Sequence, residues 1–130
     1  MKFKYKKFGK ILRPVIPIEV ATRESCVRYS VLVDSGADLC IFHSDIGTAL
    51  GLNVESGIPR EVSGITGSPE KYYLHKVSIS IGGWDHEVEV GFFPRMPDYS
   101  YGVVGQYGFF DKFVVKFDLL KEEIELKLQI

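Results

Sequence analysis

The sequence predicts an all-β fold with one short helix, and three observations support that prediction. The 13 Gly and 6 Pro of the 130-residue chain stand between short runs of β-branched and aromatic residues, as turns stand between strands. Several of those runs alternate apolar with polar residues, which is the period of a strand with one buried face. Only one segment of moderate length carries the signals of a helix. The length suits a single domain over residues 1–130 and excludes two catalytic lobes within one chain.

The N-terminal part is expected to form a basic extension and then a hairpin. Residues 1–12 are the extension, in which lysines alternate with aromatic residues from Lys2 to Lys6. Val15–Val20 follows as a strand, and Pro17 places it at an edge or irregular position because proline cannot donate to a neighbouring strand. Cys26–Val33 is a more central strand, and we expect these two strands to pair.

Ser44–Leu50 is the expected helix. Ser44 can accept a hydrogen bond from a free backbone N–H of the first turn, and Gly51 can end the helix in a left-handed conformation. His43 is expected to cap or precede the same helix. A second helical turn is expected near the C-terminus, at Gln106–Lys112.

The C-terminal half is expected to hold a longer hairpin and a final strand. Tyr73–Ile81 and Trp84–Phe92 both alternate, and Gly82 and Gly83 between them form the turn. The tail Ile124–Ile130 alternates apolar with polar residues, so one of its faces is buried. Its acids and the bases of the extension either pair across strands or form two separate solvated faces.

Charge and composition narrow the possible partners. A formal net charge of -1 gives no overall field that would attract nucleic acid or an anionic membrane, so neither partner is expected. The sequence shows no signal peptide and no apolar run of membrane-spanning length, and we expect a cytoplasmic protein. Cys26 and Cys40 lie in apolar stretches, where a thiol acts as a small hydrophobe. Cys40 and His43 have a zinc-like spacing without a second pair, so no metal site is expected.

A polar motif interrupts the most apolar strand of the chain. The run Val31–Val33 is followed at once by Asp34-Ser35-Gly36-Ala37-Asp38. A carboxyl group at the end of a buried strand is poorly solvated, which favours its neutral form unless hydrogen bonds oppose this, and general acid–base catalysis uses such groups. The same residues also suit a simple turn, because Asp and Ser bond to their own backbone and Gly supplies positive φ. This motif alone leaves both interpretations open.

A second motif lies far along the chain, where Val103-Val104-Gly105 is followed by Gln106. Together with Asp34–Ala37 and the glycine-flanked segment Ser63–Gly67, it resembles the retropepsin-like aspartic proteases. That family has a D-[ST]-G-[AS] loop, then a flap hairpin, then a hydrophobic-hydrophobic-Gly segment that packs beneath the loop. The resemblance extends from about Arg13 to Lys127.

The resemblance implies a closed β-barrel whose active site is formed by homodimerisation. An aspartic protease needs two carboxyl groups to activate one water, and this chain contains one Asp-Ser-Gly, so the second Asp34 would come from another copy. One Asp34 would act as general base on the water while its protonated partner supports the developing oxyanion. The implied substrate is an extended polypeptide, and no metal or organic cofactor is required.

Further roles carry over from the family position by position. Ser35 would brace the two loops across the dimer, and Gly36 would let the substrate backbone approach closely. The flap tip would close over the substrate and exclude water. The residues expected to support the active-site loop are Ser35, Gly36, Ala37, Val103, Val104 and Gly105. Those expected to bind substrate are Gly36, Asp38, Gly64, Ile65, Thr66 and Gly67.

Three departures from the family leave room for other interpretations. Gln106 stands where many retroviral proteases have Arg, so an Arg–Asp38 contact is lost, and Ala37 lacks the hydroxyl found in pepsins. Residues 1–12 have no clear counterpart, so the dimer can be built differently. The main alternative is a non-catalytic dimer of the same fold that binds extended peptide or scaffolds a partner. A third interpretation is a small β-barrel of unrelated function.

Overall fold

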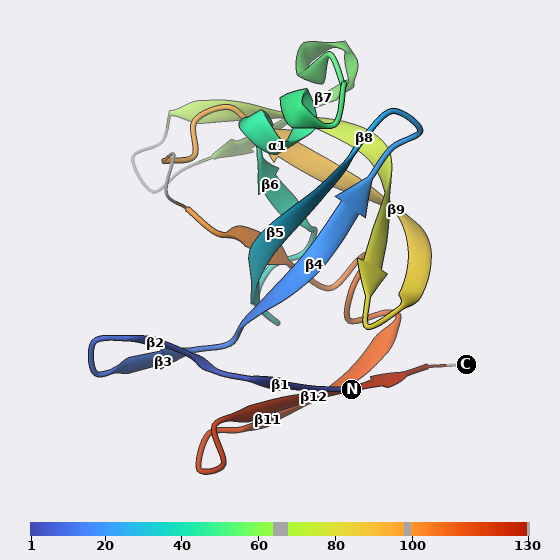
Figure 1. Ribbon diagram of the computed structural model, residues 1–130. Coiled ribbons are helices and arrows are strands. Elements are labelled where there is room, and N and C mark those ends of the chain that lie inside the picture. Colours follow the sequence, from blue (N-terminus) through green and yellow to red (C-terminus); the bar gives the residue numbers. More distant parts are fainter. Residues whose placement is uncertain (64–67, 98–99, 130) are drawn as a thin grey trace.

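The centre of the computed structural model is a closed ring of six strands (Figure 1). The structure describes residues 1–63, 68–97 and 100–129. The ring strands are β4 (Val15–Ala21), β5 (Cys26–Val33), β6 (Ile41–His43), β8 (Pro69–Ile81), β9 (Trp84–Phe93) and β10 (Gly102–Val104). Their order is β4-β5-β10-β6-β9-β8, and β8 returns to pair with β4. The predicted closed all-β fold is confirmed.

Two hairpins make up most of the ring, and both follow the alternation in the sequence. β4 pairs antiparallel with β5, and β8 pairs antiparallel with β9 around the turn at Gly82 and Gly83. Pro17 is exposed and lies opposite Ser30 of β5, whereas β8 pairs only with residues 19–21 of β4. Pro17 therefore lies in the part of β4 that pairs with β5 alone, and the predicted edge position is correct for this part of the strand.

The inward-facing residues of the ring form one apolar core, because alternate side chains of a strand point to the same face. Large side chains without measurable exposure fill the middle of this core: Ile16, Phe42, Leu50 and Phe92. Phe42 meets Phe92 edge-on, with ring centroids 6.0 Å apart. This core fixes the ends of β5 and β10, where the predicted site residues lie.

The α-helix α1 (Ser44–Ala49) confirms the expectation that His43 caps or precedes it. Its N-cap is His43, whose Nδ1 accepts a hydrogen bond from the backbone N–H of Asp45 at 2.9 Å. The prediction that Ser44 caps the helix is wrong, because Ser44 is already the first helical residue. Gly51 follows with φ of +83°, as predicted for the residue that ends the helix. A 3₁₀ turn, η1 (Val54–Ser56), comes next.

The expected helical turn at residues 106–112 is instead a series of hydrogen-bonded turns. The N–H of Asp111 donates to the carbonyl of Gln106 at 3.1 Å, five residues back, so the chain there is wider than an α-helix. The N–H of Phe113 donates to Phe109 at 3.0 Å. These turns lead directly into β11 (Phe113–Asp118).

The two termini share a second sheet of three strands below the ring (Figure 1). It consists of β1 (Lys2–Lys4), β12 (Glu123–Leu128) and β11, with β12 in the middle. Lys2 lies opposite Glu125 and Lys4 opposite Glu123, so of the two arrangements left open for the basic and acidic termini, the structure has the one in which they are neighbours across strands. On the other face of β12, Ile124 and Leu126 are buried, as the alternation indicates.

A small hairpin was not predicted. β2 (Lys6–Phe8) and β3 (Ile11–Arg13) pair only with each other within the described ranges, and Gly9 turns between them with φ of +62°. Lysine is depleted in strands and each strand has three residues, so propensity gave no signal for it. Figure 1 shows this hairpin extending away from the ring.

The two cysteines differ in their environments. Cys40 is fully buried, and this burial raises the pKa of its thiol to about 11, which keeps it an inert core residue. Cys26 is exposed at the start of β5, so the prediction that it acts as a buried hydrophobe is wrong. In the ranges that the structure describes, no helix is long and apolar enough to cross a membrane.

The β8–β9 hairpin contacts the terminal sheet through three aromatic rings. Trp84 is half-buried, stacks on His86 at 4.9 Å and meets Phe113 edge-on at 5.4 Å. The Nε2 of His86 lies 2.7 Å from the carbonyl oxygen of Gly108. Its Nδ1 is buried and has no hydrogen-bond partner among the described residues. Protonation of His86 would therefore place an unpaired N–H in the interior.

We expect His86 to make the fold less stable in mild acid. Burial is the largest cause of its lowered pKa, which Lys112 lowers further, while the Gly108 carbonyl, Asp111 and Asp85 oppose the shift. The stability gained from neutral His86 is complete above the unfolded pKa of about 6.5 and is lost as pH falls below it. Urea titrations between pH 5 and 8 should show a shallower pH dependence for His86→Gln than for wild type. Equal slopes would contradict this assignment.

Candidate active site

Asp34 is placed by the pairing of two strands that are distant in the sequence. β5 and β10 run parallel, with Val33 opposite Val104. The N–H of Asp34 donates to the carbonyl of Val104 at 3.0 Å, which extends the pairing one residue beyond β5. Val104 is fully buried, and Val103 also lies opposite Ile41 of β6. The two predicted motifs therefore meet, with the acid at the end of a central strand.

The loop after β5 holds the Asp34 carboxylate by its own backbone. Oδ1 of Asp34 accepts a hydrogen bond from the N–H of Gly36 at 2.9 Å, and the carbonyl of Asp34 accepts one from Ala37 at 3.2 Å. This is the turn that the sequence allowed, and the same turn fixes the orientation of the acid. Asp34 is half-buried, while Ser35 and Gly36 are exposed. A second chain can therefore reach the carboxylate.

Gly105 lets the β10 segment pass directly under this loop. The N–H of Gln106 donates to the carbonyl of Ala37 at 2.8 Å, and that of Tyr107 donates to Asp38 at 2.9 Å. A Cβ on Gly105 would collide with the carbonyl oxygens of Ala37 and Leu39. Glycine is needed here for close backbone approach, and its φ is not in the left-handed region.

The side chain of Gln106 makes a contact that the sequence did not predict. Its Nε2 donates to the carbonyl of Ser35 at 2.6 Å, one residue beyond Asp34. Gln106 was expected to lack the contact that Arg makes with Asp38 in many retroviral proteases. In its place, Gln106 donates to the backbone of the Asp34 loop. Asp38 is exposed. A long amide directly after Gly105 was the only sequence signal for this bond.

A cavity of about 290 Å³ lies beside the loop. Its walls come from the loop, from β6 and β9, and from the two strands expected to form the flap. They are Ala37, Asp38, Leu39, Ile41, Val62, Tyr72 and Phe93. Apart from Asp38 and the Tyr72 hydroxyl, the side chains that line it are apolar. It suits an apolar side chain of a chain segment lying across the loop.

The strands on either side of the expected flap tip form a hairpin. β7 (Ile58–Ser63) pairs antiparallel with β8, and Ser63 lies opposite Pro69. The predicted substrate-binding residues at the tip lie outside the described residues: Gly64, Ile65, Thr66 and Gly67. Val62 and Tyr72 are the described residues of this hairpin that face the cavity.

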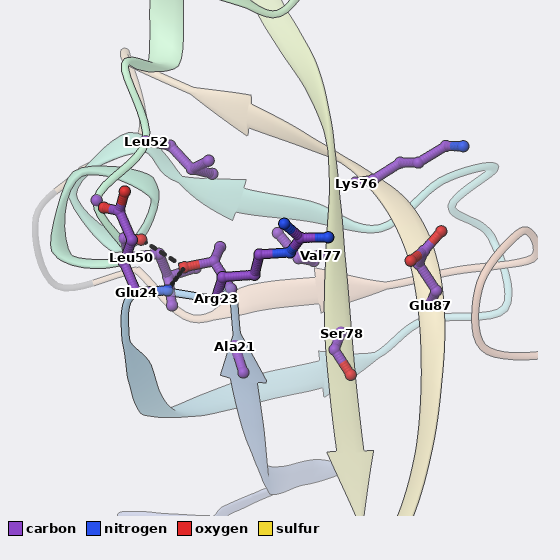
Figure 2. Close-up of a pocket in the computed structure, with 11 residues that line it drawn as sticks. Ala21, Arg23, Glu24, Leu50, Leu52, Lys76, Val77, Ser78 and Glu87 are labelled. Carbon is purple, nitrogen blue, oxygen red and sulfur yellow. Dashed lines mark hydrogen bonds between the residues drawn. The ribbon is translucent and has the colours of Figure 1, made fainter.

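A larger cavity of about 530 Å³ lies at the opposite end of β5 (Figure 2). The turn between β4 and β5 lines it with Arg23 and Glu24, and β8 and β9 add Lys76 and Glu87. The hydroxyl of Thr22 donates to the carbonyl of Leu50 at 2.7 Å, which joins this turn to the end of α1. Because β5 has eight residues, about 26 Å of strand separates this cavity from Asp34. It takes no part in the site.

The described residues offer no metal centre. Within the ranges 1–63, 68–97 and 100–129, no three His, Cys, Asp or Glu side chains come together to hold an ion. Asp38 is the next acid after Asp34 along the loop.

Comparisons with known proteins agree with this geometry. A family model described as aspartyl protease matches residues 18–107, which include both motifs. The fold is similar to that of a retropepsin-like aspartic protease from Rickettsia conorii, with a TM-score of 0.68 and 16% identity, over 97% of this chain and 88% of that one.

A second solved structure, EIAV protease in complex with an inhibitor, matches with a TM-score of 0.55 and 16% identity. The match covers 78% of this chain and 88% of the EIAV chain. A comparison with curated proteins found no match. The two structural likenesses confirm the retropepsin-like fold expected from the sequence.

Proposed function

The chain belongs to the aspartyl protease family, and we propose that it is an aspartic endopeptidase. Its active site forms between two copies of the chain, and residues 1–130 act as one domain. The observation that carries this proposal is the fixed position of Asp34. A single carboxyl group is oriented by its own loop at the end of β5, is open to a second chain, and lies beside an apolar cavity. A two-fold axis beside this loop would bring two such groups together.

In the proposed dimer the two Asp34 carboxyl groups share one proton, because like charges about 3 Å apart cannot both ionise. The ionised one takes a proton from a bound water as the oxygen of that water attacks the scissile carbonyl carbon. The protonated one donates to the carbonyl oxygen and stabilises the tetrahedral intermediate. When the C–N bond breaks, the Asp34 that took a proton from the water gives it to the leaving nitrogen. The products are a carboxylic acid and an amine.

The other predicted residues take supporting roles in this proposal. Gly36 is exposed and has no side chain, so a substrate backbone can lie against it. Asp38 is exposed at the rim of the cavity and can accept from a substrate N–H. Ser35 is exposed and braces the partner's loop, and residues 64–67 close over the substrate by strand addition.

The proposed function is tested by proteolysis with an unfolded protein mixture between pH 4 and 7.5. Wild type should cleave it, and Asp34→Asn should reduce the rate at least about 1000-fold, because an amide cannot take the water's proton. A pepstatin-type inhibitor should block the same cleavage. If a folded wild-type dimer cleaves nothing, and wild type and the Asp34→Asn variant bind unfolded peptide equally well, the protein is a binding module and the proposal is wrong.

The cavity predicts a preference for an apolar side chain in the substrate. Val62 and Ile58 are both 48% exposed on β7, but only Val62 faces the cavity. Val62→Asp should raise KM about tenfold for peptides that place an apolar residue there, with kcat nearly unchanged. Ile58→Asp is the matched control and should leave KM unchanged. Equal effects of the two substitutions would show that the cavity does not hold substrate.

Gln106 should affect catalysis without affecting substrate binding. Gln106→Leu removes the donor to the Ser35 carbonyl and leaves the loop freer to move, so we expect kcat to fall about three- to tenfold while KM stays the same. Gln106→Arg keeps N–H donors within reach of the loop and should recover most of the rate. Steady-state kinetics of both variants distinguish this role from substrate contact, which would change KM.

A further inference from the structure

The β2–β3 hairpin, residues 6–13, is called the arm below. It carries Lys6, Lys7, Lys10 and Arg13 and no acid, so its formal charge is +4. Within the described residues its strands pair only with each other. An isolated two-stranded hairpin is marginally stable in water, so the arm gains from being covered.

Contacts within the chain hold both ends of the arm, because Lys6 and Arg13 lie at its base whereas Phe8 lies next to its turn, opposite Ile11. The Phe8 ring meets Tyr101 edge-on at 5.5 Å, and the Arg13 guanidinium lies 5.1 Å from the Phe8 ring centre. Lys6 lies 5.4 Å from the Tyr101 ring centre. In contrast, Ile11 next to the turn is 57% exposed. These contacts set the direction of the arm, and the apolar side chain of Ile11 next to the turn faces solvent.

The C-terminal end of the arm lies beside Asp34. Its last strand continues into Pro14, whose carbonyl accepts a hydrogen bond from the N–H of Val33 at 2.9 Å. Gly9, in the turn of the arm, lies four residues before Arg13. The turn therefore extends about 13 Å from the end of the arm that lies beside Val33 and Asp34. If two Asp34 side chains meet across a two-fold axis, the second copy begins within that reach.

A complementary surface lies at the turn between β11 and β12, residues 117–123, called the acidic tip below. Leu119 is 60% exposed and Leu120 is 99% exposed. Three acids, Asp118, Glu122 and Glu123, against Lys121 give the segment a formal charge of -2. The acidic tip thus combines exposed leucines with charge opposite to that of the arm.

The arm and the acidic tip lie on the same side of one copy. The N–H of Tyr5, directly before the arm, donates to the carbonyl of Glu122 at 2.9 Å. Both hairpin ends point to the same side, the left in Figure 1. A two-fold interface is self-complementary, so a basic and an acidic element near the axis in one copy meet the acidic and basic elements of the other.

We propose that the arm of each copy docks on the acidic tip of a second copy, and that this exchange holds the two Asp34 loops together. The inference rests on the proposed function, which requires the dimer. Ile11 packs against Leu119 and Leu120 of the partner, and the lysines of the arm face the partner's acids. The occupant of this surface is therefore another copy of the chain.

Sedimentation velocity over a dilution series tests the contact. Ile11→Asp should raise the dimer dissociation constant at least about tenfold, because it places a carboxylate in an apolar contact beside acids. Ile58→Asp makes the same change at a comparably exposed position of β7 and should dimerise as wild type. Thermal melts confirm that both variants fold. Wild-type dimerisation of Ile11→Asp would overturn the proposal.

A charge swap tests the partner directly. Arm-reversed chains (Lys7→Glu, Lys10→Glu) and tip-reversed chains (Glu122→Lys, Glu123→Lys) should each dimerise weakly alone, because like charges then face each other. Mixed one-to-one, they should form heterodimers near wild-type affinity and recover cleavage. If arm-reversed chains dimerise normally and lose only retention on a single-stranded DNA column, the arm serves a polyanion and the proposal is wrong.

These readouts separate the inference from the proposed function. A wild-type dimer that cleaves through Asp34 but is insensitive to arm and tip substitutions overturns the docking contact alone. A dimer that responds to those substitutions but cleaves nothing, with or without Asp34, keeps the docking contact and overturns the protease function.

Discussion

A one-to-one mixture of wild-type and Asp34→Asn chains should retain about a quarter of the wild-type activity at constant total protein. After the subunits exchange, wild-type pairs make up one quarter of the dimers, and only they contain two carboxyl groups that can share a proton. With three variant chains for each wild-type chain, the expected remainder is about one sixteenth. Initial rates of peptide cleavage after equilibration give the result.

The control for this mixture is an Asp→Asn change away from the site. Asp45 lies in the first turn of α1 with a side chain 79% exposed. Asp45→Asn chains mixed with wild type should leave the activity unchanged. If mixtures with Asp34→Asn instead retain one half and one quarter of the activity, each chain works alone, and the shared site is excluded.

Gly105→Ala should remove nearly all activity and lower stability. The added methyl group collides with the carbonyl oxygens of Ala37 and Leu39, which are backbone atoms and cannot rotate away. The loop must then lift from β10, and a shift of about 1 Å at the acid costs about 100-fold in rate. Overpacking of this kind also costs about 1–3 kcal/mol in the free energy of unfolding. Peptide cleavage and urea titration measure the two effects separately.

Gly83→Ala provides the comparison for that substitution. Gly83 lies in the β8–β9 turn at φ of +84°, with no atom within 4 Å of an added Cβ. Its substitution costs backbone strain of about 1 kcal/mol without moving the loop, so activity should persist. Full activity of Gly105→Ala would show that the contact between the loop and β10 does not position Asp34.

The strands with the longest alternation were predicted best from the sequence. β4, β5, β8 and β9 match the expected segments because each buries one face against the core over several residues. β6 has three residues and β2 is rich in lysine, so neither alternation nor propensity marked them. These short strands exist because of their neighbours: β6 lies between β9 and β10, and β2 pairs with β3.

The site was predictable where residue type alone decides the structure. Asp34 was noticed because an acid directly follows an apolar strand, although that motif alone also suited a turn. Gly105 came only from the resemblance to the retropepsin-like family, and the structure gives the reason for a glycine there, since a Cβ would collide with the carbonyl oxygens of Ala37 and Leu39. His43, which was expected to cap or precede the helix, is its N-cap in place of Ser44, because Ser44 is already the first helical residue. The bond from Gln106 to Ser35 joins residues 71 positions apart, and no local pattern encodes it.

The bonds described for the Asp34 loop come from within one chain: from Val104, Gly36 and Gln106. Each half of the proposed site is therefore already shaped before a partner arrives, and association costs little further ordering of the loop. Below the dimer dissociation constant, the rate would then rise with the square of the protein concentration. In the proposed dimer, the local concentration of the protein would then itself control the rate of cleavage.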